Sequence, residues 1–254
     1  MEIRVETTSN GQLSTRSVSV TMRTPGHDFE LAAGFLFSEG ILGGRGDVRE
    51  ITYCQTAELQ EYNVVTVRFK EGLSLDPALL TRNFYTSSSC GVCGKASLEA
   101  VEVRGCQALP DGTLSLDPSL VPRYPEILLE GQKGFKRTGG LHAAGLFDAR
   151  GELLALREDV GRHNAVDKVV GHALLEDALP LDDRILVVSG RTSFEILQKA
   201  VAAGIPAVVA VGAPSTLAVE LARRFNVTLI GFARAHRFNL YAGEARVRDW
   251  EGEA

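Results

Sequence analysis

The chain has 254 residues, of which 44% are hydrophobic and 23% are charged, and its formal net charge is -5. This composition is typical of a globular protein with a sizeable core, and it argues against disorder, nucleic-acid binding and binding to anionic membranes. No apolar run approaches the ~20 residues of a membrane span, and the acidic start differs from a signal peptide, so we expect a cytoplasmic protein.

The first part of the chain predicts a small α+β domain. In chain order we expect a strand over 17–23, a helix over 27–40, a strand from Ile51 and a strand ending at Phe69. Alternating apolar residues indicate the strands, and apolar spacing that ends at a glycine indicates the helix. A turn signal begins at Pro110, so we predict an N-terminal domain over 1–110 that carries a cysteine loop at 81–95.

From residue 111 the pattern changes to alternating helices and strands. We expect a proline-interrupted helix over 119–135, a hairpin turning at 149–151, a helix over 164–179, and then strands over 182–190, 206–212 and 227–233 separated by helices over 193–204 and 215–225. Repeated strand-helix-strand units favour right-handed crossovers and a mostly parallel sheet, with ligands at the carboxyl ends of the strands. We therefore predict an α/β domain over 111–254.

The loop TSSSCGVCGKAS places Cys90 and Cys93 on a segment with few hydrophobic residues. Such a segment presents its thiols rather than burying them, and a C-x-x-C pair suits metal ligation, dithiol redox chemistry or sulfur transfer. The positive charge of Lys95, or a helix beginning near it, would lower the pKa of a thiol and favour the reactive thiolate. Two glycines beside the cysteines would let a second molecule approach the sulfur.

Two alternatives to a reactive thiolate remain for this loop. A structural zinc site needs four ligands, but Cys54 and Cys106 are isolated and the five histidines are scattered along the chain. A composite zinc site would have to draw its ligands from these separate positions. A glycine-rich turn with a purely structural role is the second alternative.

Two segments that follow strands of the second domain combine positive charge with hydroxyl groups or aromatic rings. The first consists of Gly190, Arg191, Thr192 and Ser193, before a helix whose N-terminus suits an anion. A plain helix cap by one of the two hydroxyl residues is the alternative, as it is for Ser215 or Thr216. The second segment, 232–239, reads FARAHRFN, where a base could stack and a phosphate could pair, or which is a solvated basic turn.

A third polar cluster, REDVGRHNAVDK, spans 157–168 at a predicted junction of strand and helix. So many polar residues at a strand end indicate more than packing, although ion pairing and helix capping would account for about half of them. His163 taken alone suits a hydrogen-bond partner better than a catalyst. His142 lies in an apolar predicted strand and suits a core histidine.

The strings ELAAGFLFSEGIL, SSSCGVCGKAS, TGGLHAAGLF, REDVGRHNAVDK, SGRTSFEILQKA and GFARAHRFNLY together closely resemble the FdhD/NarQ family, accessory sulfur carriers for formate dehydrogenase. The resemblance runs nearly end to end, and it implies a three-layer, cytidine deaminase-like C-terminal domain. It also implies a sulfurtransferase that takes persulfide sulfur from a cysteine desulfurase. The sulfur would then pass to the molybdenum or tungsten of bis-molybdopterin guanine dinucleotide before this cofactor enters formate dehydrogenase.

The same resemblance assigns roles to residues. Cys90 matches the persulfide carrier and Cys93 matches the second loop cysteine. The segment that matches the family's cofactor-binding residues consists of Phe232, Ala233, Arg234, Ala235, His236 and Arg237. Residues 190–193 would offer a second phosphate contact, GDP would mimic the cofactor, and two guanine nucleotide arms suggest a homodimer.

A deaminase-like fold raises zinc-dependent deamination as an alternative activity. That chemistry needs H-x-E followed by P-C-x-x-C. The H-x-E position would read His142, Ala143, Ala144, without a carboxylate, and the C-x-x-C pair precedes this histidine without a proline. The alternatives to sulfur transfer are therefore a zinc-stapled nucleotide-binding module or a deaminase-fold protein that has lost its chemistry.

Overall fold

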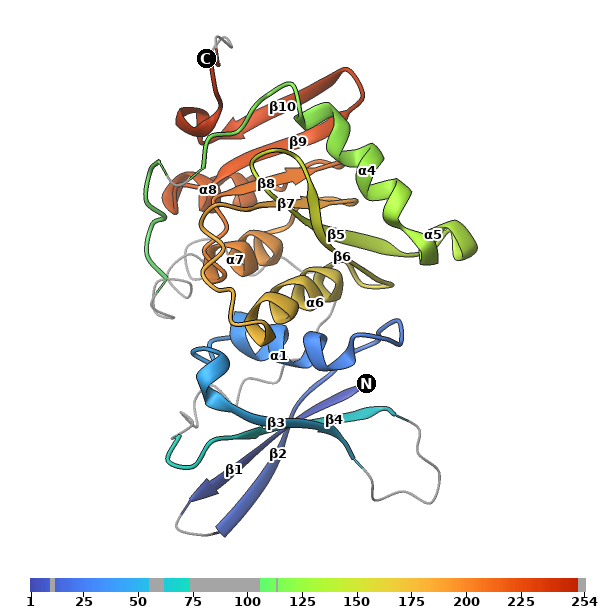
Figure 1. Ribbon diagram of the computed structural model, residues 1–254, viewed down its shortest axis with the longest axis vertical. Coiled ribbons are helices and arrows are strands. Elements are labelled where there is room, and N and C mark those ends of the chain that lie inside the picture. The colour runs from blue at the N-terminus through green and yellow to red at the C-terminus, as the bar shows by residue number, and fades with distance from the viewer. Residues whose placement is uncertain (10–11, 55–61, 74–105, 113, 251–254) are drawn as a thin grey trace.

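A computed structural model describes the chain except for residues 10–11, 55–61, 74–105, 113 and 251–254. Its strands form a four-stranded sheet of order β2-β1-β4-β3 and a six-stranded sheet of order β10-β9-β8-β7-β5-β6, one below the other in Figure 1. Helices from both halves of the chain lie between the sheets (Figure 1). No helix of these described parts is long and apolar enough to cross a membrane.

The smaller sheet confirms the predicted α+β character of the N-terminal part. It consists of β1 (Glu2–Ser9), β2 (Gln12–Val20), β3 (Val48–Tyr53) and β4 (Val64–Phe69), with α1 (Asp28–Ser38) packed on it and a 3-10 turn at Arg45–Asp47. Strand β1, which the sequence pattern did not predict, lies inside the sheet, parallel to β4 and antiparallel to β2. Its inward residues Ile3 and Val5 are fully buried. They lie two positions apart, as expected for a strand that buries one face, because successive side chains point to opposite faces of the sheet.

The larger sheet is mixed, so the prediction of a mostly parallel sheet is wrong. Its strands are β5 (His142–Phe147), β6 (Leu153–Asp159), β7 (Ile185–Val188), β8 (Ala207–Ala210), β9 (Thr228–Arg234) and β10 (Arg237–Ala242). Among these, β7-β8 and β8-β9 pair in parallel, whereas β5-β6, β5-β7 and β9-β10 are antiparallel. The connections between β5 and β6 and between β9 and β10 are too short for the crossover that parallel neighbours need.

Helices cover both faces of the larger sheet. They are η2 (Val121–Arg123), α4 (Tyr124–Gly131), α5 (Lys133–Thr138), α6 (Arg162–Leu175), α7 (Phe194–Ala202) and α8 (Thr216–Arg224), followed by η3 (Glu244–Arg246). Alternate residues of β7 divide between two cores: Leu186 and Val188 face α6 to α8, while Ile185 and Val187 face η2 and α4. The domain therefore has three layers, as expected, and its likeness to cytidine deaminases stays a prediction.

The two halves meet where α1 crosses α6. A Cβ atom on Gly171 would lie 1.8 Å from the carbonyl oxygen of Glu30, and one on Gly34 would lie 1.9 Å from that of Asp167. Only glycine permits such close approach of two helix backbones. The predicted boundary at 110 stays a prediction; just before it, the Leu109 amide donates to the Phe225 carbonyl at 3.0 Å.

Candidate functional site

The predicted carriers of sulfur, Cys90 and Cys93, lie in 74–105, outside the described residues. Their roles stay predictions. Cys54 and Cys106 are half-buried. Within the described parts of the chain no group of three or more histidine, cysteine or acidic side chains is arranged to hold a metal. A zinc site that used the cysteine loop is not tested by that result.

The two segments predicted to bind the cofactor adjoin each other through the loop after β8. The Gly212 amide donates to the Gly190 carbonyl at 3.0 Å, and the Phe232 amide donates to the Gly212 carbonyl at 3.1 Å. Two further hydrogen bonds hold the loop at 190–193 against the loop at 212–215. The Thr192 amide donates to the Ala213 carbonyl, and the Ser215 amide donates to the Thr192 carbonyl. The carboxyl ends of β7, β8 and β9 therefore lie at one edge of the sheet, the usual ligand position in such folds.

Close packing at this edge depends on glycine. A Cβ atom on Gly212 would lie 2.9 Å from the Arg191 amide nitrogen, and one on Gly231 would lie 2.8 Å from Cδ of Pro214. Real Cβ atoms do not approach other atoms so closely. Gly212 therefore lets the loops at 190–193 and 212–215 touch, and this packing brings Arg191 toward the end of β9.

The segment 232–237 is a tight hairpin rather than the loop predicted after the last strand. Strand β9 continues to Arg234, and β10, which the sequence pattern did not predict, begins at Arg237 after a two-residue turn. One face of this edge strand is exposed and carries polar residues, so β10 has few apolar residues to indicate a strand. Of the predicted residues, Ala233 is buried in the core, whereas the others, Phe232, Arg234, Ala235, His236 and Arg237, are exposed.

Phe232 has a backbone φ of 53°, in the left-handed region that a bulky residue rarely occupies. Its side chain is 36% exposed, and its amide is held by Gly212. Strained residues persist where the surrounding structure fixes them, and they gather at ligand sites. An exposed aromatic ring in the same hairpin as the exposed Arg234 and Arg237 is a suitable surface for a planar base with an anionic tail.

The start of α7 contains a contact that the sequence did not predict. Nε2 of His163 lies 2.9 Å from Oγ of Ser193 and 2.8 Å from Oε2 of Glu195. The hydrogen bond from His163 lowers the pKa of Glu195, although burial acts in the opposite direction. The carboxylate is therefore charged near neutral pH and anchors the imidazole.

His142 begins β5 and lies at the rim of the same edge, where a Cβ atom on Gly190 would be 3.2 Å from its Nδ1. It is half-buried, so the prediction of a core histidine is only partly correct. Burial lowers its pKa, and the positive charges of Arg162, His163 and Arg191 lower it further. The edge therefore collects cationic groups around a neutral imidazole, an electrostatic field that favours an anion.

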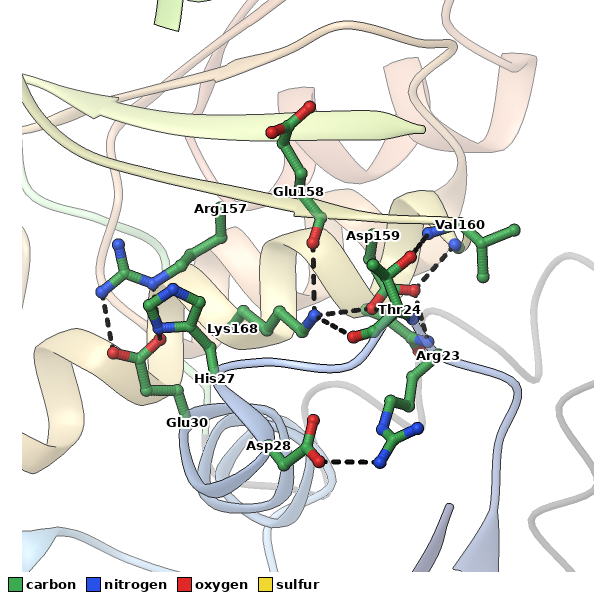
Figure 2. Close-up of polar contacts among 12 residues, drawn as sticks. Arg23, Thr24, His27, Asp28, Glu30, Arg157, Glu158, Asp159, Val160 and Lys168 are labelled. Carbon is green, nitrogen blue, oxygen red and sulfur yellow. Dashed lines mark hydrogen bonds and ion pairs between the residues drawn. The ribbon is translucent and has the colours of Figure 1, made fainter. Parts of the chain in front are cut away.

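Most polar residues of 157–168 join the two halves of the chain, as the ion-pairing alternative expected (Figure 2). The buried ammonium of Lys168 lies 2.7 Å from Oδ2 of the buried Asp159 and donates to the Thr24 and Glu158 carbonyls. Asp159 also accepts from the Thr24 amide, and Oγ1 of Thr24 accepts from the Val160 amide. The end of β6 and Lys168 of α6 therefore hold the strap, residues 21–27, that leads from β2 into α1.

Glu158 has a separate capping role. Its two carboxylate oxygens accept from the Gly134 and Phe135 amides at 2.7 Å each, at the start of α5. Acidic groups stabilise helix N-termini by satisfying these amides and by interacting with the helix dipole. Glu158 therefore positions α5 rather than a ligand.

Glu30 of α1 is a second junction between the halves. Arg157 donates to both of its carboxylate oxygens, and His27 and His172 lie 3.1 Å and 3.3 Å from them. Burial, the largest single cause, would raise the pKa of Glu30, but the Arg157 hydrogen bonds and the nearby positive charge together outweigh it, so the pKa lies below its ordinary value. The ionised carboxylate is thus preferred in the folded state.

The Glu30→Gln variant is expected to lose ~1.5–3 kcal/mol of stability at neutral pH, because it removes a charge-assisted pair of hydrogen bonds. Since the folded pKa is depressed, this stabilisation is present above the ordinary pKa and is lost as pH falls from there through the folded pKa. Urea unfolding at several pH values between about 3 and 7 should therefore give a shallower acid dependence for the variant. The Glu152→Gln variant, altered at an exposed carboxylate, is the control and should follow the wild type.

Comparison with known proteins places the chain in a family. A family model described as the FdhD/NarQ family matches residues 2–248. The chain belongs to the FdhD/NarQ family. Proteins called sulfur carrier protein FdhD are 52% identical to it in Streptomyces avermitilis, over 93% of this chain and 85% of that one, and 47% identical in Mycobacterium tuberculosis, over 97% and 89%.

A solved structure shares the fold of this FdhD/NarQ chain. It is that of a protein described as a formate dehydrogenase accessory protein from Desulfotalea psychrophila, with a TM-score of 0.68 and 24% identity. The match covers 97% of this chain and 90% of the other. The arrangement of two sheets with helices between them is therefore shared across distant sequences.

For this FdhD/NarQ chain, the sequence pointed to two segments, 190–193 and 232–237, that the structure places side by side, and their binding of the cofactor stays a prediction. The expectation that His163 is a hydrogen-bond partner is confirmed, but the sequence did not indicate its partners, Ser193 and Glu195, or the role of Gly212 between the two segments. The signal for His163 was its place at a junction of strand and helix, where side chains reach neighbouring loops. Gly212 gave no distinctive signal, because a glycine after a strand is as common in ordinary turns.

Proposed function

We propose that this protein is a sulfur carrier for formate dehydrogenase maturation. Cys90 receives sulfur from the persulfide of a cysteine desulfurase and passes it to bis-molybdopterin guanine dinucleotide before that substrate enters formate dehydrogenase in the cytoplasm. The observation that carries the proposal is the C-G-V-C-G loop in a chain of the FdhD/NarQ family, whose relatives are called sulfur carriers. The accessory protein from Desulfotalea psychrophila links the same fold to formate dehydrogenase by its description.

The first step of the proposed reaction is an exchange at sulfur. The Cys90 thiolate attacks the outer sulfur of the donor's persulfide, forms a new S–S bond, and releases the donor cysteine as a thiolate. No net oxidation takes place, since one persulfide replaces another. Glycines on both sides of the cysteines leave the backbone open to the donor.

The second step has two routes, which differ in the part played by Cys93. In one route the Cys93 thiolate attacks the inner sulfur of the Cys90 persulfide, so a disulfide forms and the outer sulfur leaves as hydrosulfide for the metal. A dithiol reductant then restores both thiols. In the other route the Cys93 thiolate attacks the outer sulfur of the Cys90 persulfide and releases the Cys90 thiolate. A dithiol reductant then attacks the inner sulfur of the Cys93 persulfide, so that hydrosulfide leaves for the metal, the reductant is oxidised to its disulfide and both cysteines end as thiols.

We assign the guanine nucleotide end of the substrate to the edge formed by 190–193, 212–215 and 232–237. The exposed ring of Phe232 suits the base, and Arg234 and Arg237 suit the pyrophosphate, which guanidinium groups pair with two hydrogen bonds. The hydrogen bonds through Gly212 support this assignment, because they make one edge of two segments that are 39 residues apart in sequence, from 193 to 232. A substrate with two guanine arms fits a homodimer with one arm on each subunit.

Calorimetry with GDP tests the assignment. The Arg234→Ala and Arg237→Ala variants are each expected to bind GDP at least about tenfold more weakly, because each loses a charge-assisted hydrogen bond of ~1.5–3 kcal/mol. The Arg150→Ala variant removes an exposed arginine on the β5-β6 hairpin and serves as the matched control. Unchanged affinity in both test variants would remove 232–237 from the site.

A further inference from the structure

We propose that His163 is a positioning residue for the nucleotide phosphate: it draws the Ser193 hydroxyl away from the start of α7 and so leaves the helix amides open to the phosphate. The inference rests on the guanine nucleotide site proposed for this edge. It adds a residue that lies outside the two binding segments and acts through Ser193 rather than on the ligand.

The argument starts from two equivalent serines. Ser193 and Ser215 are the N-cap residues of α7 and α8, each follows a parallel strand, and each has extended backbone angles. Oγ of Ser215 accepts from the Ala218 amide at 3.2 Å, an ordinary helix cap. Within the described residues, the Ser193 side chain makes no such bond, although the Ile196 amide occupies the matching position. The plain-cap alternative is therefore confirmed for Ser215 but not for Ser193.

The difference between the two serines is the presence of His163. Its Nε2 lies 2.9 Å from Oγ of Ser193, whose hydroxyl also lies 3.4 Å from Oε2 of Glu195. The His163 side chain is only 17% exposed and is anchored by Glu195 at 2.8 Å. The serine hydroxyl is thus engaged by the imidazole and the carboxylate, which leaves the first-turn amides of α7 without their usual side-chain partner.

A second observation points to a ligand at the same place. Thr192, which directly precedes the N-cap, is 1% exposed, and its Oγ1 is buried without a hydrogen-bond partner in the described part of the chain. A buried hydroxyl that lacks an acceptor is costly and calls for one. Phosphate oxygens accept from both hydroxyl and amide groups, and a helix N-terminus favours their charge. The exposed guanidinium of Arg191 adds positive charge beside them.

Removal of the imidazole should reverse this arrangement. In the His163→Ala variant the Ser193 hydroxyl is free to rotate onto the Ile196 amide, as Ser215 does onto Ala218. The phosphate must then compete with a cap worth ~1 kcal/mol, so GDP should bind about fivefold more weakly. The His163→Gln variant, whose side-chain amide can still donate to the Ser193 hydroxyl, should bind more tightly than His163→Ala.

The decisive measurement is a double variant. If His163 acts through Ser193, then His163→Ala combined with Ser193→Ala should bind GDP more tightly than His163→Ala alone, because nothing remains to cap the amides. A His163 that touched the phosphate itself would give a double variant as weak as the single one, or weaker, and this outcome would overturn the proposal. The His172→Ala variant, altered on the same helix but at Glu30, is the matched control and should keep wild-type affinity.

Hydrogen exchange tests the same mechanism without ligand. The Ile196 amide should be more protected in His163→Ala than in the wild type, while the protection of Ala218 should not change. Equal protection of Ile196 in both proteins would overturn the inference.

GDP binding separates failure of the proposed site from failure of the inference. If the wild-type protein does not bind GDP, the proposed nucleotide site is wrong and the inference falls with it. If the wild type binds GDP and His163→Ala binds it equally well, only the inference is wrong.

Discussion

The Lys168→Met variant is expected to lose ~3–5 kcal/mol of stability, because it leaves the buried carboxylate of Asp159 without its charge partner. Asp159 is fully buried and Lys168 is 1% exposed, so water cannot replace the lost ammonium. The same ammonium donates to the Thr24 carbonyl, and its removal also loosens the strap between β2 and α1 (Figure 2). Urea unfolding, with the midpoint and slope compared with those of the wild type, measures the effect.

An exposed ion pair provides the control for this prediction. Arg150 contacts Asp148 at 3.0 Å with its side chain 79% exposed, so Arg150→Ala should change stability by less than ~1 kcal/mol. Combining Lys168→Met with Asp159→Asn should recover part of the loss, since a neutral amide tolerates burial better than an unpaired charge. A Lys168→Met protein as stable as Arg150→Ala would contradict the view that this pair joins the two halves.

The Cys90→Ala variant is expected to abolish formate dehydrogenase maturation in cells that depend on this protein. In the proposed reaction Cys90 is the thiolate that accepts the donor's sulfur, so without it the cofactor is expected to reach the dehydrogenase lacking that sulfur. Dehydrogenase activity, together with the amount of carrier protein in the same cells, measures the effect. An active dehydrogenase in the Cys90→Ala cells would contradict the proposed function.

The other cysteines give matched controls for Cys90. Cys54 and Cys106 are half-buried and lie outside the C-x-x-C pair, so Cys54→Ala and Cys106→Ala should retain maturation. The Cys93→Ala variant separates the two release routes. If Cys93 forms the disulfide, this variant should accumulate persulfide on Cys90 and release little of it, and the wild type should show a reducible disulfide after turnover.

Local sequence patterns predicted most elements of the larger domain because its strands are buried and its helices are amphipathic. The continuous apolar run of β7 and the stripe that includes Val166 and Val169 on α6 are examples, and these residues are buried as expected. The exposed elements were harder to predict. In β1 only Ile3 and Val5 are apolar and a polar run follows them, while in β10 arginine and asparagine interrupt the apolar residues.

Strand direction could not be derived from the order of elements alone. Strand-helix-strand units do give the parallel core of β7, β8 and β9, but hairpins at both ends add antiparallel strands. The sequence predicts the hairpin at 149–151, and a hairpin joins antiparallel strands; parallel pairing is expected only where a helix connects two neighbouring strands. The tight turn before Arg237 carries no glycine and so gave no signal.

Contacts between distant segments were the least predictable part of the site. The engagement of Ser193 by His163 joins residues that are 30 positions apart, and the hydrogen bond from the Thr24 amide to the Asp159 carboxylate spans 135. A sequence pattern reports which side chains are available but not which loop they reach. The polar string at 157–168 was recognised as unusual, and the structure shows that most of it joins the two halves, while His163 faces the candidate nucleotide edge.

Intact mass spectrometry after incubation with a cysteine desulfurase and cysteine tests the central claim most directly. The wild-type protein should gain the mass of one sulfur atom, a dithiol reductant should remove it, and the modified peptide should contain Cys90. The Cys90→Ala variant should gain none, while Cys106→Ala should gain as much as the wild type. A Cys90→Ala protein that still gained the full mass of sulfur would contradict the assignment of Cys90 as the carrier.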